Sequence, residues 1–410
     1  MTRPEVPVPQ RPDPQALAVD TFRGWLARPA PLDRMFSGRQ KSEKWAQDLG
    51  KAVWTRLDAM VRFGVLFSAA RGRDPHGLTD PGKVRRALLD LGPRELAEAV
   101  DGTPPAWLTD GKARLEDGDA VERCAAHGVP AWWAPALEAR FGDRLDAFLA
   151  AQDRRPPLWA RLARREDAAK VTDSLVRDGL RPTVDAGGFS LRVDGNRAIQ
   201  GTEAAQNGWI EVQDLASQRA GEAVPLAPGA HVWDACAGAG GKTLLLAGRL
   251  AGKGAVYASD VSRDKIEILK KRTVNAEWQN IRTSVWDGTA PRRLPREAPD
   301  GFDSVLVDAP CSSSGTWRRN PDAKLRFGPD EGNGLAALQL QLITNAAPSV
   351  KPGGALTWAT CSWDRAEDED LVARFVAANP EFTVERSKLL GPPELDSDTL
   401  FVSVLRRASA

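Results

Sequence analysis

From Pro228 to the C-terminus, the chain alternates short apolar runs with segments of helical periodicity. The apolar runs are HVWDACA, AVYASD, IRTSVWD, DSVLVDAP and ALTWATCS, and amphipathic segments separate several of them. Strands joined through helices pair in parallel, because a parallel connection needs a long crossover. The alternation therefore predicts an α/β domain with a mainly parallel, doubly wound sheet. EFTVER and LFVSVLRR have no helix between them, so we expect an antiparallel pair at the C-terminal edge.

The 410 residues are enough for two or three domains, and the character of the sequence divides them. Residues 1–15 are rich in proline and are expected to form an extended tail. Residues 16–152 carry apolar residues at helical spacing, which predicts a helical N-terminal domain. Residues 153–227 mix a helical segment with short strand-like runs and are expected to form a small α+β module. The α/β domain then occupies residues 228–410.

Composition excludes several classes of protein. Four cysteines without a CxxC pair and three histidines predict neither a disulfide framework nor a metal site. The chain shows no apolar run of membrane-spanning length and no signal-peptide pattern at its N-terminus, so we expect a soluble cytoplasmic protein. The 56 basic and 55 acidic residues nearly cancel, so net charge does not indicate a nucleic-acid partner.

A glycine-rich loop follows the first predicted strand, in the segment DACAGAGGKT. Its glycines, of which Gly240 and Gly241 are paired, allow the backbone to turn tightly and approach a ligand in front of a helix. A P-loop is one interpretation, because Gly241, Lys242 and Thr243 fit its end. Cys236, however, stands where its first glycine belongs.

The alternative is a site for a nucleoside-containing ligand, which calls for an acidic residue at the end of the next strand to hold ribose hydroxyls. Asp260 ends AVYASD, and Asp287 ends the following strand, where it can accept a hydrogen bond from an adenine amino group. With Asp234, these carboxylates suit an adenosine-containing ligand such as S-adenosylmethionine better than a triphosphate, which they would repel. Each aspartate taken singly is as consistent with a helix or turn cap.

Two of the four cysteines, Cys311 and Cys361, follow apolar runs in VLVDAPCSSSG and GGALTWATCSWD. Ligands bind at such strand ends, so both thiols are candidates for one pocket. Cytosine carbon-5 is a poor nucleophile, and a thiolate added at carbon-6 makes the ring able to attack an electrophilic methyl group. Asp308 is placed to stabilise the charge that develops at ring N3, and a second thiol can assist release. Buried cysteines that only pack are the competing interpretation, which we keep for Cys124 and Cys236.

Three segments in this order, DACAGAGGKT, VLVDAPCSSSGTWRRNPDAK and ATCSWDRAEDED, resemble the Nop/Sun family of RNA 5-methylcytosine methyltransferases, of the bacterial Sun/Fmu type. GWIEVQDLASQ resembles that family's lead-in to the catalytic domain, so the resemblance covers about residues 157–410. It implies a class I S-adenosylmethionine-dependent methyltransferase fold, Rossmann-like, with S-adenosyl-L-methionine as cofactor. It also implies methylation of carbon-5 of cytosine in RNA, with ribosomal RNA as the first candidate and transfer RNA as the next.

Carried over by position, the resemblance makes Cys361 the nucleophile and Cys311 the thiol that assists release. Asp308 becomes the group that engages the cytosine, with Lys242 close to it. The cofactor contacts fall on Cys236, Ala237, Gly238, Ala239, Gly240, Gly241, Lys242, Asp260, Asp287 and Asp308. The family usually has proline before the paired glycines, where this chain has Ala239.

The RNA contacts are the least constrained part of the sequence. The resemblance implies Arg319, whereas Arg161 and Arg165 belong to a group of arginines around Trp159, a mixture suited to phosphate contacts and base stacking. The helical domain is a further candidate for RNA binding, and a surface for a protein partner is equally consistent with it. We expect a monomer. A P-loop-type nucleotide-binding protein and a non-catalytic RNA-binding assembly factor are the alternatives left open.

Overall fold

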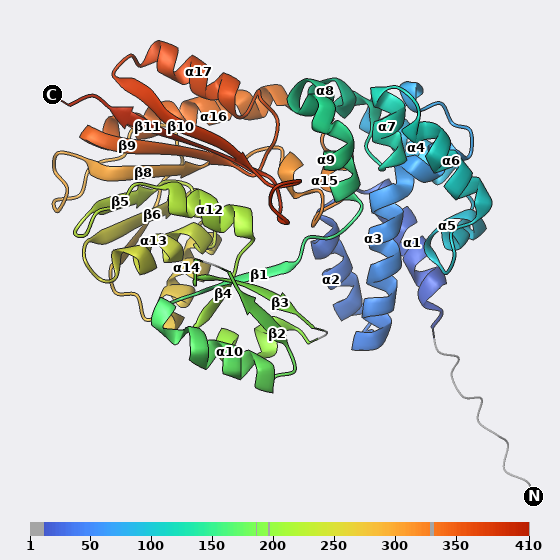
Figure 1. The fold of residues 1–410 in the computed structure, drawn as a ribbon, viewed down its shortest axis with the longest axis horizontal. Coiled ribbons are helices and arrows are strands. Elements are labelled where there is room, and N and C mark those ends of the chain that lie inside the picture. Colours follow the sequence, from blue (N-terminus) through green and yellow to red (C-terminus); the bar gives the residue numbers. More distant parts are fainter. Residues whose placement is uncertain (1–11, 186, 196, 329–331, 410) are drawn as a thin grey trace, which may run out of the picture. The chain divides into compact units, whose positions relative to one another are not determined.

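The computed structural model falls into two compact units (Figure 1). The helical unit comprises Met1–Asp153 and Asn320–Pro329, and the sheet unit comprises Arg154–Arg319 and Asp330–Ala410. The described residues are 12–185, 187–195, 197–328 and 332–409.

Most of the expected N-terminal tail, residues 1–11, lies outside the described residues. Helix α1 (Pro14–Ala27) includes the last two residues of the predicted tail. The Asp13 carboxylate accepts hydrogen bonds from the Gln15 and Ala16 amides, and proline suits the first helical position, so the start is well defined.

The helical unit is built around α3 (Gln47–Ala70), which carries core side chains such as Val53, Leu57 and Val61 with no exposed surface. The other α-helices are short and often begin at an aspartate cap or a proline. They are α2 (Leu32–Ser42), α4 (Pro81–Leu89), α5 (Pro93–Val100), α6 (Ala106–Glu116), α7 (Ala120–Ala126), α8 (Ala134–Phe141) and α9 (Leu145–Gln152). Within the described part of the chain, no helix has both the length and the apolar character needed to cross a membrane.

A short segment from the C-terminal half of the chain also belongs to the helical unit. Helix α15 (Ala323–Arg326) follows the predicted Cys311 motif, yet Leu325 is part of the helical core. Trp133 Nε1 donates to the Lys324 carbonyl at 3.0 Å, and Lys324 Nζ donates to the Arg62 carbonyl at 2.6 Å. Burial lowers the pKa of Lys324 to about 7. A four-residue helix is too short to show helical periodicity, so this placement was not predictable from the sequence.

Residues 154–214 fold around a small antiparallel sheet in the order β2-β3-β1-β4. Its strands are β1 (Leu158–Leu162), β2 (Arg181–Val184), β3 (Ser190–Asp194) and β4 (Ile210–Val212), with helices α10 (Ala168–Arg177) and α11 (Glu203–Gln206). The amphipathic α10 buries Val171 and Leu175 among strand residues such as Leu191.

The large sheet has seven strands in the order β10-β11-β9-β8-β5-β6-β7. The five strands from β9 to β7 are parallel, and β11 joins β9 and β10 in antiparallel fashion. Its strands are β5 (His231–Asp234), β6 (Ala255–Asp260), β7 (Ile281–Val285), β8 (Phe302–Asp308), β9 (Val350–Thr360), β10 (Phe382–Leu390) and β11 (Leu400–Arg407). The predicted α/β fold class with an antiparallel C-terminal pair is confirmed.

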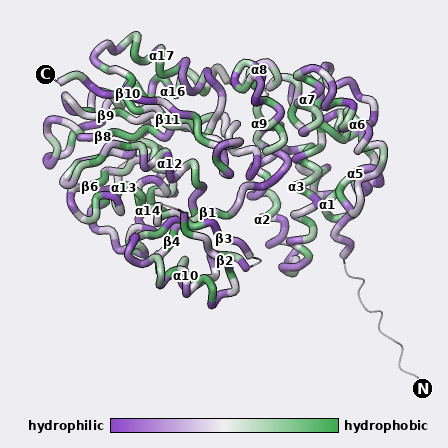
Figure 2. Tube along the Cα trace, viewed as in Figure 1, coloured by the Kyte–Doolittle hydropathy of each residue, from purple (hydrophilic) through white to green (hydrophobic). Residues whose placement is uncertain are grey.

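Helices cover both faces of this sheet (Figure 1). One face packs against α12 (Leu215–Ala223), α13 (Gly241–Leu250) and α14 (Arg263–Asn275), and the other against α16 (Gly332–Ala346) and α17 (Glu369–Ala378). Hydrophobic colour runs along β8 and β9 in Figure 2, where Val305, Leu306 and Val307 have no exposed surface. Strand order reverses between β5 and β8, and ligands of such sheets bind at the carboxyl ends next to that reversal.

Candidate active site

The glycine loop connects β5 to α13 and lies tightly against α14. Gly240 has a φ of 93°, in the left-handed region that favours glycine, and a Cβ there would lie 2.2 Å from Leu269 Cδ1. The Gly238 amide donates to Asp260 Oδ2 at 2.9 Å. The loop therefore presents its backbone, rather than long side chains, at the carboxyl end of β5. Burial raises the pKa of the Cys236 thiol, which suits a packing role.

The three aspartates that follow β5, β6 and β7 differ in what they face. Asp234 is buried, and its Oδ2 accepts from Thr243 Oγ1 at 2.6 Å; burial raises its pKa to about 7. Asp260 accepts amide hydrogen bonds from Gly238 and Ser262. Asp287 is exposed, and the backbone amide of Thr289 lowers its pKa. Asp260 and Asp287 therefore lie at the carboxyl ends of their strands, whereas Asp234 is buried and holds Thr243 at the start of α13.

The P-loop interpretation fails on the same contacts. A P-loop offers its threonine hydroxyl to a magnesium ion and its lysine to phosphates. Here the Thr243 hydroxyl is buried against Asp234, and Lys242 Nζ donates to Asp308 Oδ2 at 2.8 Å. Burial alone would lower the pKa of Lys242, but the charge of Asp308 and this hydrogen bond raise it overall. Lys242 and Asp308 therefore form an ion pair between α13 and the end of β8.

The two predicted thiols meet at the ends of β8 and β9. Cys311 Sγ and Cys361 Sγ are 3.3 Å apart, and Cys361 Sγ is 3.7 Å from Ser313 Oγ. The hydrogen bond from Cys311 lowers the pKa of Cys361, and the same bond together with burial raises the pKa of Cys311 well above its usual value. The opposite directions of the two pKa shifts make Cys361 the more acidic thiol of the pair. The predicted pairing of the two cysteines in one place is what the structure shows.

A buried carboxylate that sequence reasoning missed supports the Cys311 loop. Glu367 Oε1 accepts from the Ser312 amide at 2.8 Å and from Gln339 Nε2 at 3.0 Å, and its Oε2 accepts from Ser312 Oγ at 2.6 Å. Glu367 is one of several acidic residues in the run AEDED. Charge alone does not show which of them points inward, so the segment carried no usable signal.

The predicted RNA-binding residue Arg161 is 1% exposed, so the prediction that it contacts RNA is wrong. Its Nε donates to Gln213 Oε1 at 2.7 Å, and its Nη2 donates to the Gly241 carbonyl at 3.2 Å. Burial lowers the pKa of Arg161 to about 10. The inward position on β1 explains the error, because alternate residues of a strand face opposite sides.

Arg319 and Arg165 lie in different surroundings. Arg319 Nε donates to Asp398 Oδ2 and its Nη2 to Asp214 Oδ2, both at 3.0 Å. It thereby ties the loop after β8 to the start of α12, a structural role that the sequence did not reveal. Arg165 is exposed, and its guanidinium lies 5.7 Å from the centre of the Phe189 ring. RNA contact by either residue stays a prediction.

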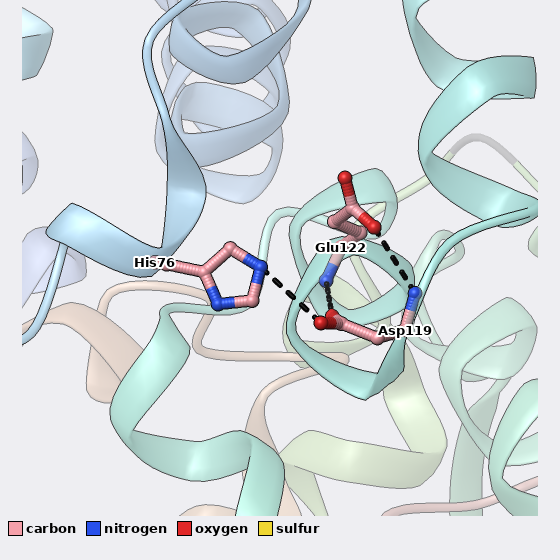
Figure 3. A group of neighbouring side chains, drawn as sticks. All are labelled: His76, Asp119 and Glu122. Carbon is pink, nitrogen blue, oxygen red and sulfur yellow. Dashed lines mark hydrogen bonds and ion pairs between the residues drawn. The ribbon is translucent and has the colours of Figure 1, made fainter.

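One group in the helical unit is close enough to share a metal ion, as Figure 3 shows for His76, Asp119 and Glu122. Asp119 caps α7 and accepts from the amides of Val121 and Glu122, while Glu122 accepts from the Asp119 amide. His76 Nε2 lies 3.3 Å from Asp119 Oδ2. These contacts form a helix cap with an ion pair beside it, which accounts for the group without a metal.

The strand order, the glycine loop after β5 and the carboxylates after β6 and β7 define the class I fold of S-adenosylmethionine-dependent methyltransferases. The family model described as 16S rRNA methyltransferase RsmB/F matches residues 223–403. The predicted resemblance to the Nop/Sun family is thereby confirmed over this part of the chain.

Two curated relatives illustrate the similarity. The Bacillus subtilis (strain 168) protein named probable ribosomal RNA small subunit methyltransferase B is 32% identical over 227 residues, which are 54% of this chain and 49% of that protein. Ribosomal RNA small subunit methyltransferase B of Enterobacter sp. (strain 638) is 30% identical over 263 residues, 62% of this chain and 59% of that protein. The chain thus spans about half of the length of the first relative and about three fifths of the second.

Solved structures share the fold. The crystal structure of PH0851 superposes with a TM-score of 0.76 at 22% identity and covers 97% of this chain and 99% of that one. NSun6 from Pyrococcus horikoshii, solved with SFG, has a TM-score of 0.58 at 16% identity and covers 67% of this chain and 97% of that one. At these identities the likeness concerns the fold alone.

Proposed function

We propose that this chain is an RNA methyltransferase that uses S-adenosyl-L-methionine to methylate carbon-5 of cytosine. Small-subunit ribosomal RNA is the first candidate substrate, as the names of the curated relatives suggest, and transfer RNA is the second. The observation that carries the proposal is the pair of thiols 3.3 Å apart, with the Lys242–Asp308 ion pair at the end of β8, the strand that leads to Cys311. Cytosine-C5 chemistry needs a thiol nucleophile and a group that stabilises charge at ring N3, and this combination supplies both together with a second thiol that can assist release.

The residues of the glycine loop fit S-adenosyl-L-methionine. A loop that passes close to a ligand, followed by carboxylates on the next two strands, offers backbone groups and hydrogen-bond acceptors for ribose and adenine. Asp260 uses each carboxylate oxygen for one amide and keeps acceptor capacity for ribose hydroxyls. Asp287 is exposed and suits the adenine amino group. When bound, this cofactor supplies an electrophilic methyl group.

Cys361 is the nucleophile in this proposal. Its Sγ forms a bond to carbon-6 of the cytosine, and the electrons of the carbon-5–carbon-6 double bond move into the ring as N3 takes up a proton. Asp308 faces the base, and the Lys242 ammonium 2.8 Å away is the source of that proton. Carbon-5 is then nucleophilic enough to accept the methyl group.

Cys311 completes the reaction by removing the carbon-5 proton, after which the carbon–sulfur bond breaks and Cys361 leaves as a thiolate. In the resting site the hydrogen bond to Cys361 holds the pKa of Cys311 high. Once Cys361 is bonded to carbon, the hydrogen bond that raises the pKa of Cys311 is lost, so Cys311 can give its own proton to solvent and then take the carbon-5 proton as a thiolate. The electrons of that carbon–hydrogen bond re-form the carbon-5–carbon-6 double bond, and N3 returns its proton to Asp308 and Lys242. The raised resting pKa thus keeps the second thiol neutral until the adduct has formed.

A covalent-trapping experiment tests this assignment. Full-length wild type, Cys311→Ala and Cys361→Ala are incubated with labelled small-subunit ribosomal RNA and S-adenosyl-L-methionine, then separated on a denaturing gel. Cys311→Ala should accumulate a protein–RNA adduct, because methylation proceeds while release fails, and Cys361→Ala should form none. Cys124→Ala, at a buried cysteine of the helical unit, serves as the matched control and should behave like wild type.

Methyl transfer that survives Cys361→Ala would contradict the mechanism. It would also favour the alternative of an assembly factor in which the fold is retained without this catalysis. Bisulfite mapping of cellular RNA with and without the protein identifies the modified cytosine and separates ribosomal from transfer RNA.

We also propose that residues 16–152 and 153–227 help to bind the RNA. At the border between the second region and the α/β domain, a cavity of about 490 Å³ is lined by Arg164, Arg165 and Phe189 from that region and by Trp278 from the α/β domain. The Arg164 guanidinium lies 5.1 Å from the centre of the Trp278 ring. Guanidinium groups beside aromatic rings suit phosphate contacts and base stacking, which supports this role for the region.

A further inference from the structure

Two arginines hold the backbone of the glycine loop on either side of Gly240. Arg272 Nη1, from α14, donates to the Ala239 carbonyl at 2.6 Å, and Arg161 Nη2, from β1, donates to the Gly241 carbonyl at 3.2 Å. The Gly240 amide donates to the Ala237 carbonyl at 2.9 Å. Because the peptide between residues 239 and 240 is planar, these bonds fix its orientation at both ends.

Each arginine is itself oriented by a neighbour from the segment WIEVQD. Glu211 Oε2 accepts from Arg272 Nη2, and Gln213 Oε1 accepts from Arg161 Nε. Glu211 and Gln213 are two residues apart in an extended segment, so both side chains leave it on the same side. Strand β4 and the residue that follows it therefore set the direction of both guanidinium groups.

Such a support matters because of what the loop contains. Glycine has more accessible backbone conformations than any other residue. A loop that contains Gly238 and Gly240, both at positive φ, is therefore intrinsically flexible unless other groups restrain it. Residue 239 is alanine, which does not restrict φ as a proline would. A ligand that binds such a loop must order it first, unless the protein has already done so.

We propose that Arg272, oriented by Glu211, is a positioning residue for the cofactor, with Arg161 and Gln213 as the second arm of the same clamp. The clamp pre-organises the glycine loop in this chain, in place of a stiffening proline at position 239. This inference rests on the proposed function, because it takes the loop as the site for S-adenosyl-L-methionine. Arg272 acts through the loop backbone, so its loss weakens cofactor binding without removing a catalytic group.

Calorimetric titration of the full-length protein with S-adenosyl-L-methionine tests the proposal. Arg272→Ala should raise the Kd about tenfold, the effect of losing one charge-assisted hydrogen bond. Lys271→Ala, an exposed neighbour on the same helix, is the matched control and should bind like wild type. Glu211→Gln should give a smaller increase, about threefold, because Arg272 remains but loses its orienting charge.

Rescue separates positioning from a general loss of structure. Arg272→Lys keeps a cationic donor and should recover part of the affinity. Ala239→Pro, added to Arg272→Ala, should also recover affinity by restricting the backbone directly. Wild-type affinity in Arg272→Ala, or a loss that neither rescue reverses, would overturn the inference while leaving the cofactor assignment intact. Absence of binding by wild type would overturn the proposed function and the inference together.

Discussion

The glycine loop after β5 and the thiol pocket after β8 and β9 lie on the same edge of one sheet, yet they are built in different ways. The loop is held through backbone groups: the Gly238 amide and the Ala239 and Gly241 carbonyls all have side-chain partners elsewhere. The thiol pocket is formed by side chains: Cys311 contacts Cys361, and Asp308 accepts a hydrogen bond from Lys242.

The difference between the glycine loop and the thiol pocket indicates which residues can be substituted without loss of function. A backbone-built site depends on the conformation of the chain, so side chains such as Ala239 and Cys236 are replaceable as long as that conformation survives. A side-chain-built site depends on the identity of each reacting atom, so even a single-atom change is disruptive.

The same substitution made in both regions gives the largest expected contrast. Cys361→Ser should reduce methyl transfer at least about a thousandfold, because a serine hydroxyl is far less nucleophilic than a thiolate. Cys236→Ser should change the rate less than about twofold, because this thiol only packs in the loop. The measurement is the single-turnover rate on small-subunit ribosomal RNA at saturating cofactor. Equal effects at the two positions would erase the distinction between the regions.

Asp308→Asn should lower the same rate about a hundredfold, because the amide cannot pass the Lys242 proton to the base. The Kd for S-adenosyl-L-methionine should change much less. Asp300→Asn, an exposed aspartate ahead of β8, is the matched control. A large loss of cofactor affinity with an unchanged rate would instead place Asp308 with the glycine loop.

Asp234→Asn should affect stability rather than chemistry. The pKa of Asp234 is 3.8 when unperturbed and about 7 in the folded protein, so between these values the folded state binds the extra proton. The group's contribution to stability therefore falls as pH rises from about 4 to about 7, by at most about 4 kcal/mol. Asparagine still accepts the Thr243 hydrogen bond but does not titrate.

Melting temperatures of wild type and Asp234→Asn, measured at pH 5 and pH 8, check this expectation. The variant should lose less stability than wild type over this interval and should melt several degrees higher at pH 8. Other titrating groups, such as Asp398 with a raised pKa of about 6, are present in both proteins and cancel in the comparison. Parallel pH profiles for the two proteins would show that Asp234 does not titrate in this range.

Strand ends were predictable because burial and alternation are local properties. Runs such as VLVDAP and ALTWATC read as buried strands, and parallel strands bring their carboxyl ends to one edge, so the meeting of Cys311 with Cys361 followed from their positions. The glycine loop and Asp260 were predictable for the same reason, since both are strand-end features of adjacent strands.

The roles of charged residues were the hardest to predict, because the sequence does not show whether a charged side chain points into the protein or into solvent. Arg161 was predicted to contact RNA and is buried next to the glycine loop, while no sequence feature singled out Glu367, which holds the Cys311 loop. Arg272 carried no signal at all, although it contacts the Ala239 carbonyl. Burial of a charge depends on partners supplied by segments far away in the chain.

The sequence by itself determined the α/β class, the order of the strand-end motifs and the residue types available for chemistry, because each is encoded within a short stretch of chain. Only the tertiary structure decided which thiol carries the lowered pKa, which arginines support the loop, and that α15 packs in the helical core. These features depend on distances and desolvation between residues tens to hundreds of positions apart, and no local pattern records them.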